Sequence, residues 1–403
     1  MDTLLITHWR DKICTVLYSE GRPLQITLES PKRPSRLNNI YIGKVQKIVP
    51  GIQAAFVDIA PGEAGYYSLA ENKSHHFVSS PRKEVKPGDE LVVQVVRDAV
   101  KTKAPVLSAN LSLPGRYCVV TDGSGDIGIS AKITDAERRE TLRRILSEEM
   151  DPSLGVVIRT NAASAPDEAI LREYRALKRR YEKLRDTWSS RTCYSLLYES
   201  PPSFVEGLRD MPGEGERKII TDDPQIYESI RAYLAESGSL PSDMAGGGSE
   251  GRQAVQLVLY QDSQLPLNKL YSLDTVLERA LDKKVWLKSG GYLVIEPTEA
   301  MVVIDVNSGK YSAKKQQRET IFRINREAAE EIARQLRLRN LSGIILVDFI
   351  DMDDPEDREA LLRFLGGILK KDPVKTILVD MTPLGLVEIT RKKVRKPLYE
   401  QQA

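Results

Sequence analysis

Two aspartates end strongly apolar segments in the last third of the chain. Asp305 follows Met-Val-Val-Ile and precedes Asn307 by two residues, and Asp348 follows Gly-Ile-Ile-Leu-Val. A carboxylate within an apolar strand is unfavourable unless it is paired, hydrogen-bonded or bound to a cation. Two such carboxylates suit Mg²⁺, which keeps several waters and accepts phosphate oxygens as further ligands. An ion held there can orient a water for in-line attack, so the pair indicates phosphodiester hydrolysis.

The same aspartates have a second interpretation, because Asp is a favoured residue immediately before a helix. Each stands before a helical pattern and could cap it. Both flank the same long helix, and Asn307 follows one of them, which favours the metal site. Asp351, Asp353 and Asp354 lie in the loop beyond Asp348, and we expect them to cap the next helix.

The segments around these aspartates alternate between strand and helix patterns. Strand patterns cover residues 292–296, 301–306, 343–349 and 374–379, and helical patterns cover residues 314–338 and 355–370. This alternation predicts a sheet whose strands are buried under helices. Open α/β sheets place their ligand sites at the carboxyl ends of the strands, so Asp305 and Asp348 are expected to lie together.

The first two thirds of the chain contain shorter elements. Strand patterns at residues 4–6, 13–18 and 24–28 precede a basic, proline-bounded linker at 31–34. Short strand patterns then predict a small closed barrel of the OB type, at residues 40–49, 54–59, 65–69, 91–97 and 106–112. Helical patterns at 134–150 and 166–188 enclose a strand at 155–160, and residues 196–265 mix short elements around a glycine-rich loop at 246–249.

Composition excludes several classes of protein. A chain of 403 residues is expected to form two to four domains. No apolar run approaches the roughly 20 residues of a membrane helix, and the N-terminus lacks a signal-peptide pattern. Three widely separated cysteines, Cys14, Cys118 and Cys193, argue against zinc ribbons and disulfide frameworks and favour a reducing cytoplasm. The His75-His76 pair is expected in a solvated loop.

Charge gives only local indications of a nucleic-acid partner. The net charge is +2, so any binding to nucleic acid must come from patches rather than from the whole molecule. Basic runs lie at residues 32–36, 172–185 and 391–396. Such runs are usually solvated faces, and none of them decides the function alone.

Four segments of the last third occur in a specific order: VIDVNSG at 303–309, NREAAEEIARQLRLR at 325–339, the apolar segment at 343–352 and MTPLGLVEITR at 381–391. In this order they resemble the ribonuclease E/ribonuclease G family, and the likeness runs through essentially the whole chain. The resemblance implies an α+β multidomain fold. Its α/β nuclease domain has an RNase H-like part and a DNase I-like part, and it carries an inserted OB-fold β-barrel and a small 5′-end-sensing domain.

The implied domains follow one another along the chain. Residues 1–37 and 205–270 are the two parts of the RNase H-like subdomain, and residues 38–114 are the OB-fold RNA-binding domain. Residues 115–204 are the 5′-phosphate sensor, and residues 271–403 are the DNase I-like catalytic subdomain.

The resemblance also implies an activity. Asp305 and Asp348 would hold catalytic Mg²⁺, with Mn²⁺ as an alternative, and Asn307 would orient one carboxylate or the scissile phosphate. The family hydrolyses single-stranded RNA internally and leaves a 5′-monophosphate on the downstream product, in mRNA turnover and rRNA processing in the cytoplasm. A non-catalytic RNA-binding protein that uses its α/β part for assembly is the alternative. A pure binder has no reason to keep the carboxylate pair with Asn307.

The predicted barrel carries aromatic residues, Phe56, Tyr66 and Tyr67, where an OB fold stacks bases. Stacking on aromatic rings tolerates any base, as an RNA-processing nuclease requires. A lone Phe56 is equally typical of a core. The resemblance favours stacking for Phe56 and Tyr66, with Lys103 contacting the RNA backbone.

A strand pattern ends in Arg159-Thr160, a pair that can bind a terminal phosphate through charge-assisted hydrogen bonds. From the residues alone, Arg159 could be an ordinary surface charge. The resemblance implies that this pair recognises the RNA 5′-monophosphate, helped by Gly115 and Val119. The family often has an arginine pair where this chain has Ala131 and Lys132, which predicts a weaker pocket.

The resemblance leaves the assembly open. The family commonly continues into a Cys-Pro-x-Cys element through which two subunits share zinc, and the sequence ends at Ala403 without these cysteines. Either the sequence is truncated or this member assembles without zinc. We expect no zinc from this chain, and a homodimer or homotetramer without the zinc link.

Overall fold

The computed structural model describes residues 2–31, 35–79, 82–99, 103–123, 125–211, 216–236, 255–309 and 317–402. These form two compact units. The barrel unit contains Lys32–Ile219 and Pro224–Val258, and the helix–sheet unit contains Asp2–Pro31, Ile220–Asp223 and Leu259–Ala403. Most of the predicted linker, the glycine-rich loop and residues 314–316 of the predicted long helix lie outside the described residues. No helix within the described ranges is both long and apolar enough to cross a bilayer.

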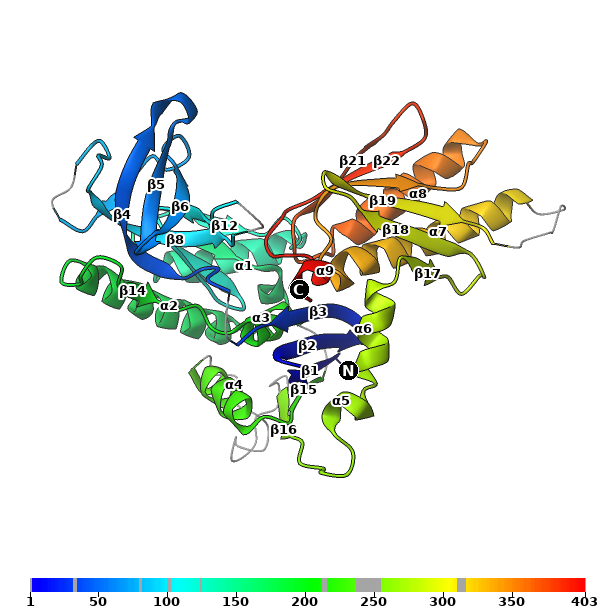
Figure 1. Ribbon diagram of the computed structural model, residues 1–403, viewed down its shortest axis with the longest axis horizontal. Coiled ribbons are helices and arrows are strands. Elements are labelled where there is room, and N and C mark those ends of the chain that lie inside the picture. Colours follow the sequence, from blue (N-terminus) through cyan, green and yellow to red (C-terminus); the bar gives the residue numbers. More distant parts are fainter. Residues whose placement is uncertain are drawn as a thin grey trace. The chain divides into compact units, whose positions relative to one another are not determined.

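A closed barrel is the first part of the barrel unit (Figure 1). Its described strands follow the order β14-β4-β5-β6-β9-β8-β7, and a further pairing of β4 with β8 closes the barrel around five strands. Valine, leucine and the buried ring of Tyr67 fill its interior. The prediction of an OB-like barrel is therefore confirmed. The strands are β4 (Ile40–Val49), β5 (Ala54–Ala60), β6 (Glu63–Ser68), β7 (His76–Phe77), β8 (Glu90–Arg97), β9 (Val106–Ser108) and β14 (Leu196–Tyr198).

A small sheet with two helices follows the barrel in sequence. Its described strands have the order β10-β11-β13-β12 and comprise Ser112–Pro114, Cys118–Asp122, Leu154–Ile158 and Ile127–Ile129 respectively. Helices α1 (Ala136–Ser147) and α2 (Asp167–Trp188) pack their apolar stripes on it. The helix predicted at 166–188 is confirmed as α2, and its buried stripe contains Ile170, Tyr174, Leu177, Tyr181 and Leu184.

A third sheet joins segments from the beginning and the middle of the chain. Strands β1 (Asp2–Trp9), β2 (Lys12–Ser19) and β3 (Arg22–Glu29) lie at the three predicted strand positions and form an antiparallel meander. Strands β15 (Arg217–Thr221) and β16 (Val255–Leu259) extend it in the order β16-β15-β1-β2-β3. The boundary between the two units passes through β15 and β16. The same part of the sequence contains the helices α3 (Ser203–Asp210), α4 (Pro224–Glu236), α5 (Leu267–Leu270) and α6 (Leu273–Leu281).

The helix–sheet unit is built on a mixed sheet with the described order β17-β18-β19-β20-β22-β21. Only β19 and β20 pair in parallel, and the other neighbours are antiparallel. The strands are β17 (Lys284–Trp286), β18 (Tyr292–Pro297), β19 (Met301–Asn307), β20 (Gly343–Asp348), β21 (Thr376–Met381) and β22 (Val387–Arg391). Helix α9 (Leu398–Gln401) follows the last strand in sequence.

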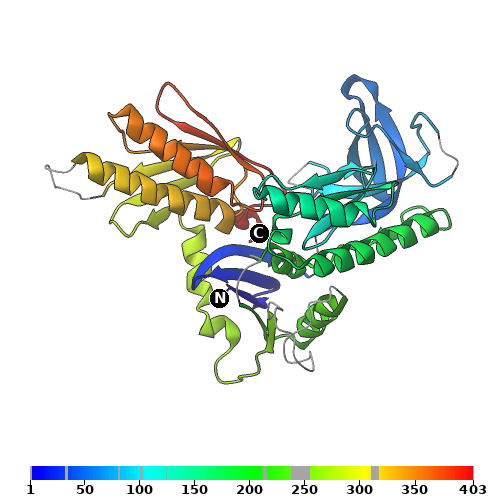
Figure 2. The ribbon, with the colours of Figure 1, turned by 180° about the vertical axis from the view of Figure 1, so that it is seen from behind.

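The expectation that helices bury this sheet is wrong for one of its faces. Helices α7 (Gln317–Leu338) and α8 (Pro355–Leu369) lie on the same side of it (Figures 1 and 2). Ile304 and Ile345 point into the core beneath these helices, whereas Val303 and Ile344 are exposed on the other face. Apolar residues on both faces concealed the alternation in the sequence. Strand β22, which separates β20 from β21, was not predicted.

Candidate functional site

Asp305 and Asp348 lie side by side at the carboxyl ends of two neighbouring parallel strands. Asp305 of β19 is the direct partner of Asp348 of β20. Directly paired residues project from the same face of a sheet. Both side chains are exposed on the face that α7 and α8 leave uncovered. The prediction that they meet is confirmed, but their supposed burial inside apolar strands is not, because they belong to the open face.

Asn307 lies beside the two aspartates, and we call Asp305, Asp348 and Asn307 together the acidic group. It stands two residues after Asp305 on the same face, and its Nδ2 donates a hydrogen bond of 2.7 Å to Asp305 Oδ2. This bond fixes the direction of one carboxylate oxygen and leaves the other open. The turn that follows is tight, because Gly309 has φ +67° and a side chain there would press against the carbonyl of Gly290.

The charges of the acidic group repel one another. Burial raises the pKa of Asp348, and the nearby charges of Asp305 and Asp351 raise it further. Asp348 does not cap the next helix, because Asp354 accepts from the Glu356 N–H and caps α8 as predicted. Two negative carboxylates close together favour a proton or a cation between them. The acidic group therefore has the electrostatics of a cation site.

The ligand set fits one kind of ion better than others. Among the described residues there is no group of three or more His, Cys, Asp or Glu side chains able to hold a metal. Two carboxylates with open positions are too few for a closed protein cage, but they are what Mg²⁺ takes when water and phosphate oxygens complete its shell. Asp305 and Asp348 could therefore hold Mg²⁺ or Mn²⁺, with Asn307 orienting the first.

Asn325 of α7 holds the loop beyond Asp348, and the sequence analysis did not single it out. Its buried side-chain amide donates to the Ile350 carbonyl (2.7 Å) and accepts from the Ile350 N–H (3.1 Å). A fully buried Asn within an apolar helical stripe was the signal that could have identified it.

Phe56 and Tyr66 lie together on the outer surface of the barrel. They are direct partners across β5 and β6, both partly exposed, with ring centroids 6.3 Å apart in an edge-to-face arrangement. Lys47 of β4 places its Nζ 4.9 Å from the Phe56 ring centre, a contact that the sequence did not indicate. Lys103 is exposed and precedes β9. Pro105, which lies between Lys103 and β9, accepts a hydrogen bond from the Tyr66 N–H.

Tyr67 and the histidine pair are structural, contrary to expectation. Tyr67 is fully buried in the barrel and bonds His75 through its hydroxyl at 2.7 Å. His76 lies in β7, where its Nε2 is 2.9 Å from Asp122 Oδ2 and its ring packs against Trp188. The pair therefore links the barrel to the small sheet, because its apolar neighbour Phe77 enters the barrel core.

The predicted phosphate-sensing residues meet at one end of the small sheet. Arg159 Nη1 donates to the Gly115 carbonyl at 2.8 Å, and the Arg159 N–H donates to the Tyr117 carbonyl. Val119 pairs directly with Pro114 and with Val157 on its two neighbouring strands. Thr160 Oγ1 lies 3.1 Å from the Ser130 hydroxyl. Ala131 and Lys132 follow Ser130 and are exposed.

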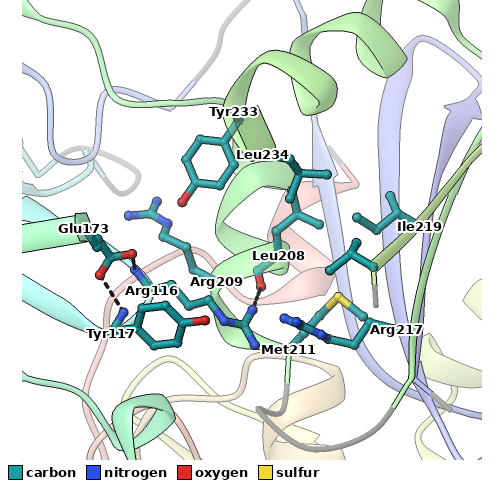
Figure 3. A pocket seen from close by; sticks show the side chains of 11 residues that line it. Arg116, Tyr117, Glu173, Leu208, Arg209, Met211, Arg217, Ile219, Tyr233 and Leu234 are labelled. Atoms are coloured by element: carbon teal, nitrogen blue, oxygen red, sulfur yellow. Dashed lines mark hydrogen bonds between the residues drawn. The ribbon is translucent and has the colours of Figure 1, made fainter. Parts of the chain in front are cut away.

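Glu173 braces the turn that carries Gly115. Its buried carboxylate accepts hydrogen bonds from the backbone N–H groups of Arg116 and Tyr117 (Figure 3) and from that of Cys118. Gly115 has no room for a Cβ, which would collide with this carboxylate.

A pocket beside this turn is lined by arginines. Arg116 donates to the Leu208 carbonyl of α3 at 3.0 Å (Figure 3). Arg209 of α3 donates to the Pro114 carbonyl at 2.8 Å, so both arginines connect α3 with the turn. These contacts hold the end of the small sheet where Arg159 lies.

The chain is similar to known ribonucleases along most of its length. The profile of the Ribonuclease E/G family matches residues 112–394. Ribonuclease G of Salmonella typhimurium (strain SL1344) is 36% identical over 393 residues, which cover 94% of this chain and 78% of that protein. Ribonuclease G of Escherichia coli (strain K12) is 35% identical, with 95% and 78% covered. Ribonuclease E of Synechocystis sp. (strain ATCC 27184 / PCC 6803 / Kazusa) is 32% identical, with 97% and 56% covered.

Proposed function

Because the chain belongs to the ribonuclease E/G family, we propose that it is an endoribonuclease that hydrolyses single-stranded RNA internally. We place this activity in mRNA turnover and rRNA processing in the cytoplasm. The observation that carries the proposal is the pairing of Asp305 with Asp348, with Asn307 bonded to the first. A protein that only bound RNA would gain nothing from two mutually repelling carboxylates on an open sheet face.

In this proposal Asp305 and Asp348 hold Mg²⁺, with Mn²⁺ as a substitute. When bound, the ion activates a water and neutralises the charge that develops on the phosphate. The two carboxylates bind the cation that relieves their repulsion, and Asn307 keeps Asp305 directed toward it. Attack by water on the phosphorus breaks the P–O3′ bond, so the upstream product ends in a 3′-hydroxyl and the phosphate stays on the 5′ end of the downstream product.

The proposal is tested by the variants Asp305→Asn and Asp348→Asn. Each removes one negative ligand but keeps the side-chain shape, so we expect cleavage of single-stranded RNA in Mg²⁺ to fall about a thousandfold or more. RNA affinity measured with a chelator present should stay within about twofold. Asp353→Asn, an exposed carboxylate in the loop beyond Asp348, is the matched control and should cleave normally. Substantial cleavage by either active-site variant would exclude these ligands.

The barrel provides a surface for RNA in this proposal. Phe56 and Tyr66 stack bases, and Lys47 and Lys103 contact the backbone. Support comes from the partial exposure of both rings and from the lysine beside Phe56. Single-stranded RNA is commonly bound in this way, by aromatic rings and adjacent cations.

We further propose that Gly115, Val119, Arg159 and Thr160 bind the 5′-monophosphate of the substrate. The Arg159 guanidinium and the Thr160 hydroxyl would supply charge-assisted hydrogen bonds, and their closeness to Gly115 supports the assignment. Ala131 and Lys132 offer one cation where the family often has two, so we expect a modest preference.

This second proposal is tested with one RNA that carries either a 5′-monophosphate or a 5′-hydroxyl. We expect the monophosphate to be cleaved about tenfold faster at limiting substrate, and Arg159→Ala to abolish the difference. Arg144→Ala, an exposed arginine on α1, is the control and should keep the preference. Equal rates for the two RNAs would remove the sensor assignment.

The same family membership suggests the domain layout and the assembly. We propose an RNase H-like subdomain from residues 1–37 and 205–270, an OB-fold domain at 38–114, a sensor domain at 115–204 and a DNase I-like subdomain at 271–403. The sheet that combines β1–β3 with β15 and β16 supports the first of these. We propose assembly into a homodimer or homotetramer.

A further inference from the structure

Two aromatic rings and a lysine lie together at the β17 edge of the mixed sheet. Trp286 of β17 exposes 65% of its surface, and Tyr292 of β18 is partly exposed. Their ring centroids are 5.3 Å apart. Lys284 places its Nζ 4.1 Å from the indole centre and 3.7 Å from the phenol centre. We call these three residues the aromatic platform.

The strand register places the aromatic platform on the same face as the acidic group. Trp286 pairs with Tyr292, and Tyr292 pairs with Asn307 on the next strand. Directly paired residues share a face, and neighbouring strands are about 4.8 Å apart. The backbone of Trp286 is thus about 10 Å from that of Asn307 across the open face.

The platform does not belong to the core of the sheet. Leu293 and Ile295 alternate with Tyr292 along β18 and are buried beneath the helices, so the platform points the other way. A tryptophan left this exposed on an edge strand promotes unwanted association, which makes it unfavourable unless it binds something. The exposed rings are therefore available to bind a group from solution.

Charge identifies the occupant as a polyanion with flat, stackable groups. The neighbouring Lys283 forms an ion pair with Glu296, but among the described residues no carboxylate lies within ion-pair distance of the Lys284 ammonium. Its charge is thus available to a phosphate, and the rings beside it are available to a base. Bases of single-stranded nucleic acid stack on such rings, and adjacent cations contribute.

We propose that Trp286, Tyr292 and Lys284 form a stacking subsite for a base of single-stranded RNA close to the scissile phosphate. This inference rests on the proposed function, since it takes the acidic group as the point of cleavage. The aromatic platform binds the RNA equally tightly in the ground state and in the transition state of cleavage. It therefore sets KM and leaves kcat nearly unchanged.

The first test is kinetic. Trp286→Leu keeps an apolar side chain in β17 but removes the stacking face, and it should raise KM for single-stranded RNA about 5- to 100-fold with kcat within twofold. Trp286→Phe should recover much of the loss. Ile377→Ser is the matched control, because Ile377 is 45% exposed on β21 at the opposite edge of the same sheet, and its KM should not change. An unchanged KM in Trp286→Leu overturns the proposal.

The second test observes the indole directly, without cleavage. In chelator, an RNA oligonucleotide should change the tryptophan fluorescence of the wild type and of Trp188→Phe, but not that of Trp286→Leu. A signal that survives in Trp286→Leu overturns the platform. The proposal is also overturned if Trp286→Leu changes the oligomeric state of the protein but leaves its RNA affinity unaltered. That outcome would indicate that this edge binds another protein chain.

The two tests separate this inference from the proposed function. If the fluorescence change depends on Trp286 but the wild type never cleaves RNA in Mg²⁺, the platform stands and the proposed activity is wrong. If cleavage requires Asp305 and Asp348 but ignores Trp286, the activity stands and the platform is wrong.

Discussion

Two asparagines position the acidic group in different ways. Asn307 bonds directly to Asp305, whereas Asn325 acts from α7 by holding both backbone groups of Ile350, two residues beyond Asp348. A displacement of about 1 Å at a reacting group can lower a rate about a hundredfold. We therefore expect Asn325 to act as a positioning residue whose influence on Asp348 passes through the backbone.

The variant Asn325→Ala tests this role. It leaves the Ile350 backbone groups without their partners, so we expect a stability loss of about 1–3 kcal/mol and a kcat about tenfold lower. KM for RNA should hardly change, while the Mg²⁺ concentration for half-maximal activity should rise. Arg323→Ala, an exposed position on the same helix, should change none of these quantities. A stability loss without an effect on kcat or on the Mg²⁺ requirement would make Asn325 merely structural.

Element contacts explain how the barrel is connected to the small sheet. Asp122 of β11 contacts both neighbours. Its Oδ2 lies 2.9 Å from His76 Nε2 of β7, and its Oδ1 accepts a hydrogen bond of 2.6 Å from the Tyr181 hydroxyl of α2. Burial acts to raise the pKa of Asp122, but the hydrogen bonds from His76 and Tyr181 outweigh it and hold the pKa below its usual value. The charged carboxylate thus stabilises this junction of elements.

This depressed pKa predicts how Asp122→Asn changes with pH. The carboxylate stabilises the fold above its unfolded pKa, near 3.9, and the stabilisation is lost as pH falls through the lower folded pKa. We therefore expect the variant to be about 1–2 kcal/mol less stable than wild type at pH 7, with the difference shrinking below about pH 4. Chemical denaturation from pH 7 to pH 3 measures this. Asp186→Asn on the exposed face of α2 is the control. A difference that persists unchanged at pH 3 contradicts the mechanism.

At the scale of the whole chain, each of the two compact units has its own buried charged group. In the barrel unit, Glu173 accepts three backbone hydrogen bonds. In the helix–sheet unit, Arg391 is buried and bonds Asp372 at 2.7 Å, as well as Asn340 and the Leu341 carbonyl. Arg391 began one of the basic runs of the sequence, but its burial removes it from any surface patch.

Separate cores predict unfolding that is not two-state. We expect calorimetry to resolve two transitions. Glu173→Gln should lower the free energy of unfolding of the barrel unit by about 1–3 kcal/mol, and Arg391→Met should lower that of the helix–sheet unit by about 3–5 kcal/mol. Glu168→Gln and Lys392→Ala, both in exposed positions, are the controls and should have little effect. One transition that both core variants shift together would show that the units unfold as one.

Strand and helix patterns were largely readable from the sequence, because hydrophobic periodicity is a local property. The barrel strands, strands β1–β3, helix α2 and the strands around Asp305 and Asp348 were predicted close to their observed bounds. The ends of apolar strands also identified the two aspartates. The sequence did not indicate strands β11, β12 and β17, the antiparallel insertion of β22 or the open face of the mixed sheet. Pairing partners and the covering of a face depend on segments far apart in sequence.

By itself, the sequence determined the family, the main elements and the acidic residues most suited to chemistry. The tertiary structure decided which side chains meet. Tyr67 and His76 were expected at the surface, but the structure shows that they make structural contacts, and it shows that Arg391 is buried. It also brought Trp286 and Tyr292 onto the face of Asp305. The physical reason is that burial and register are set by neighbours in space, and a one-residue change in register would move every such side chain to the opposite face.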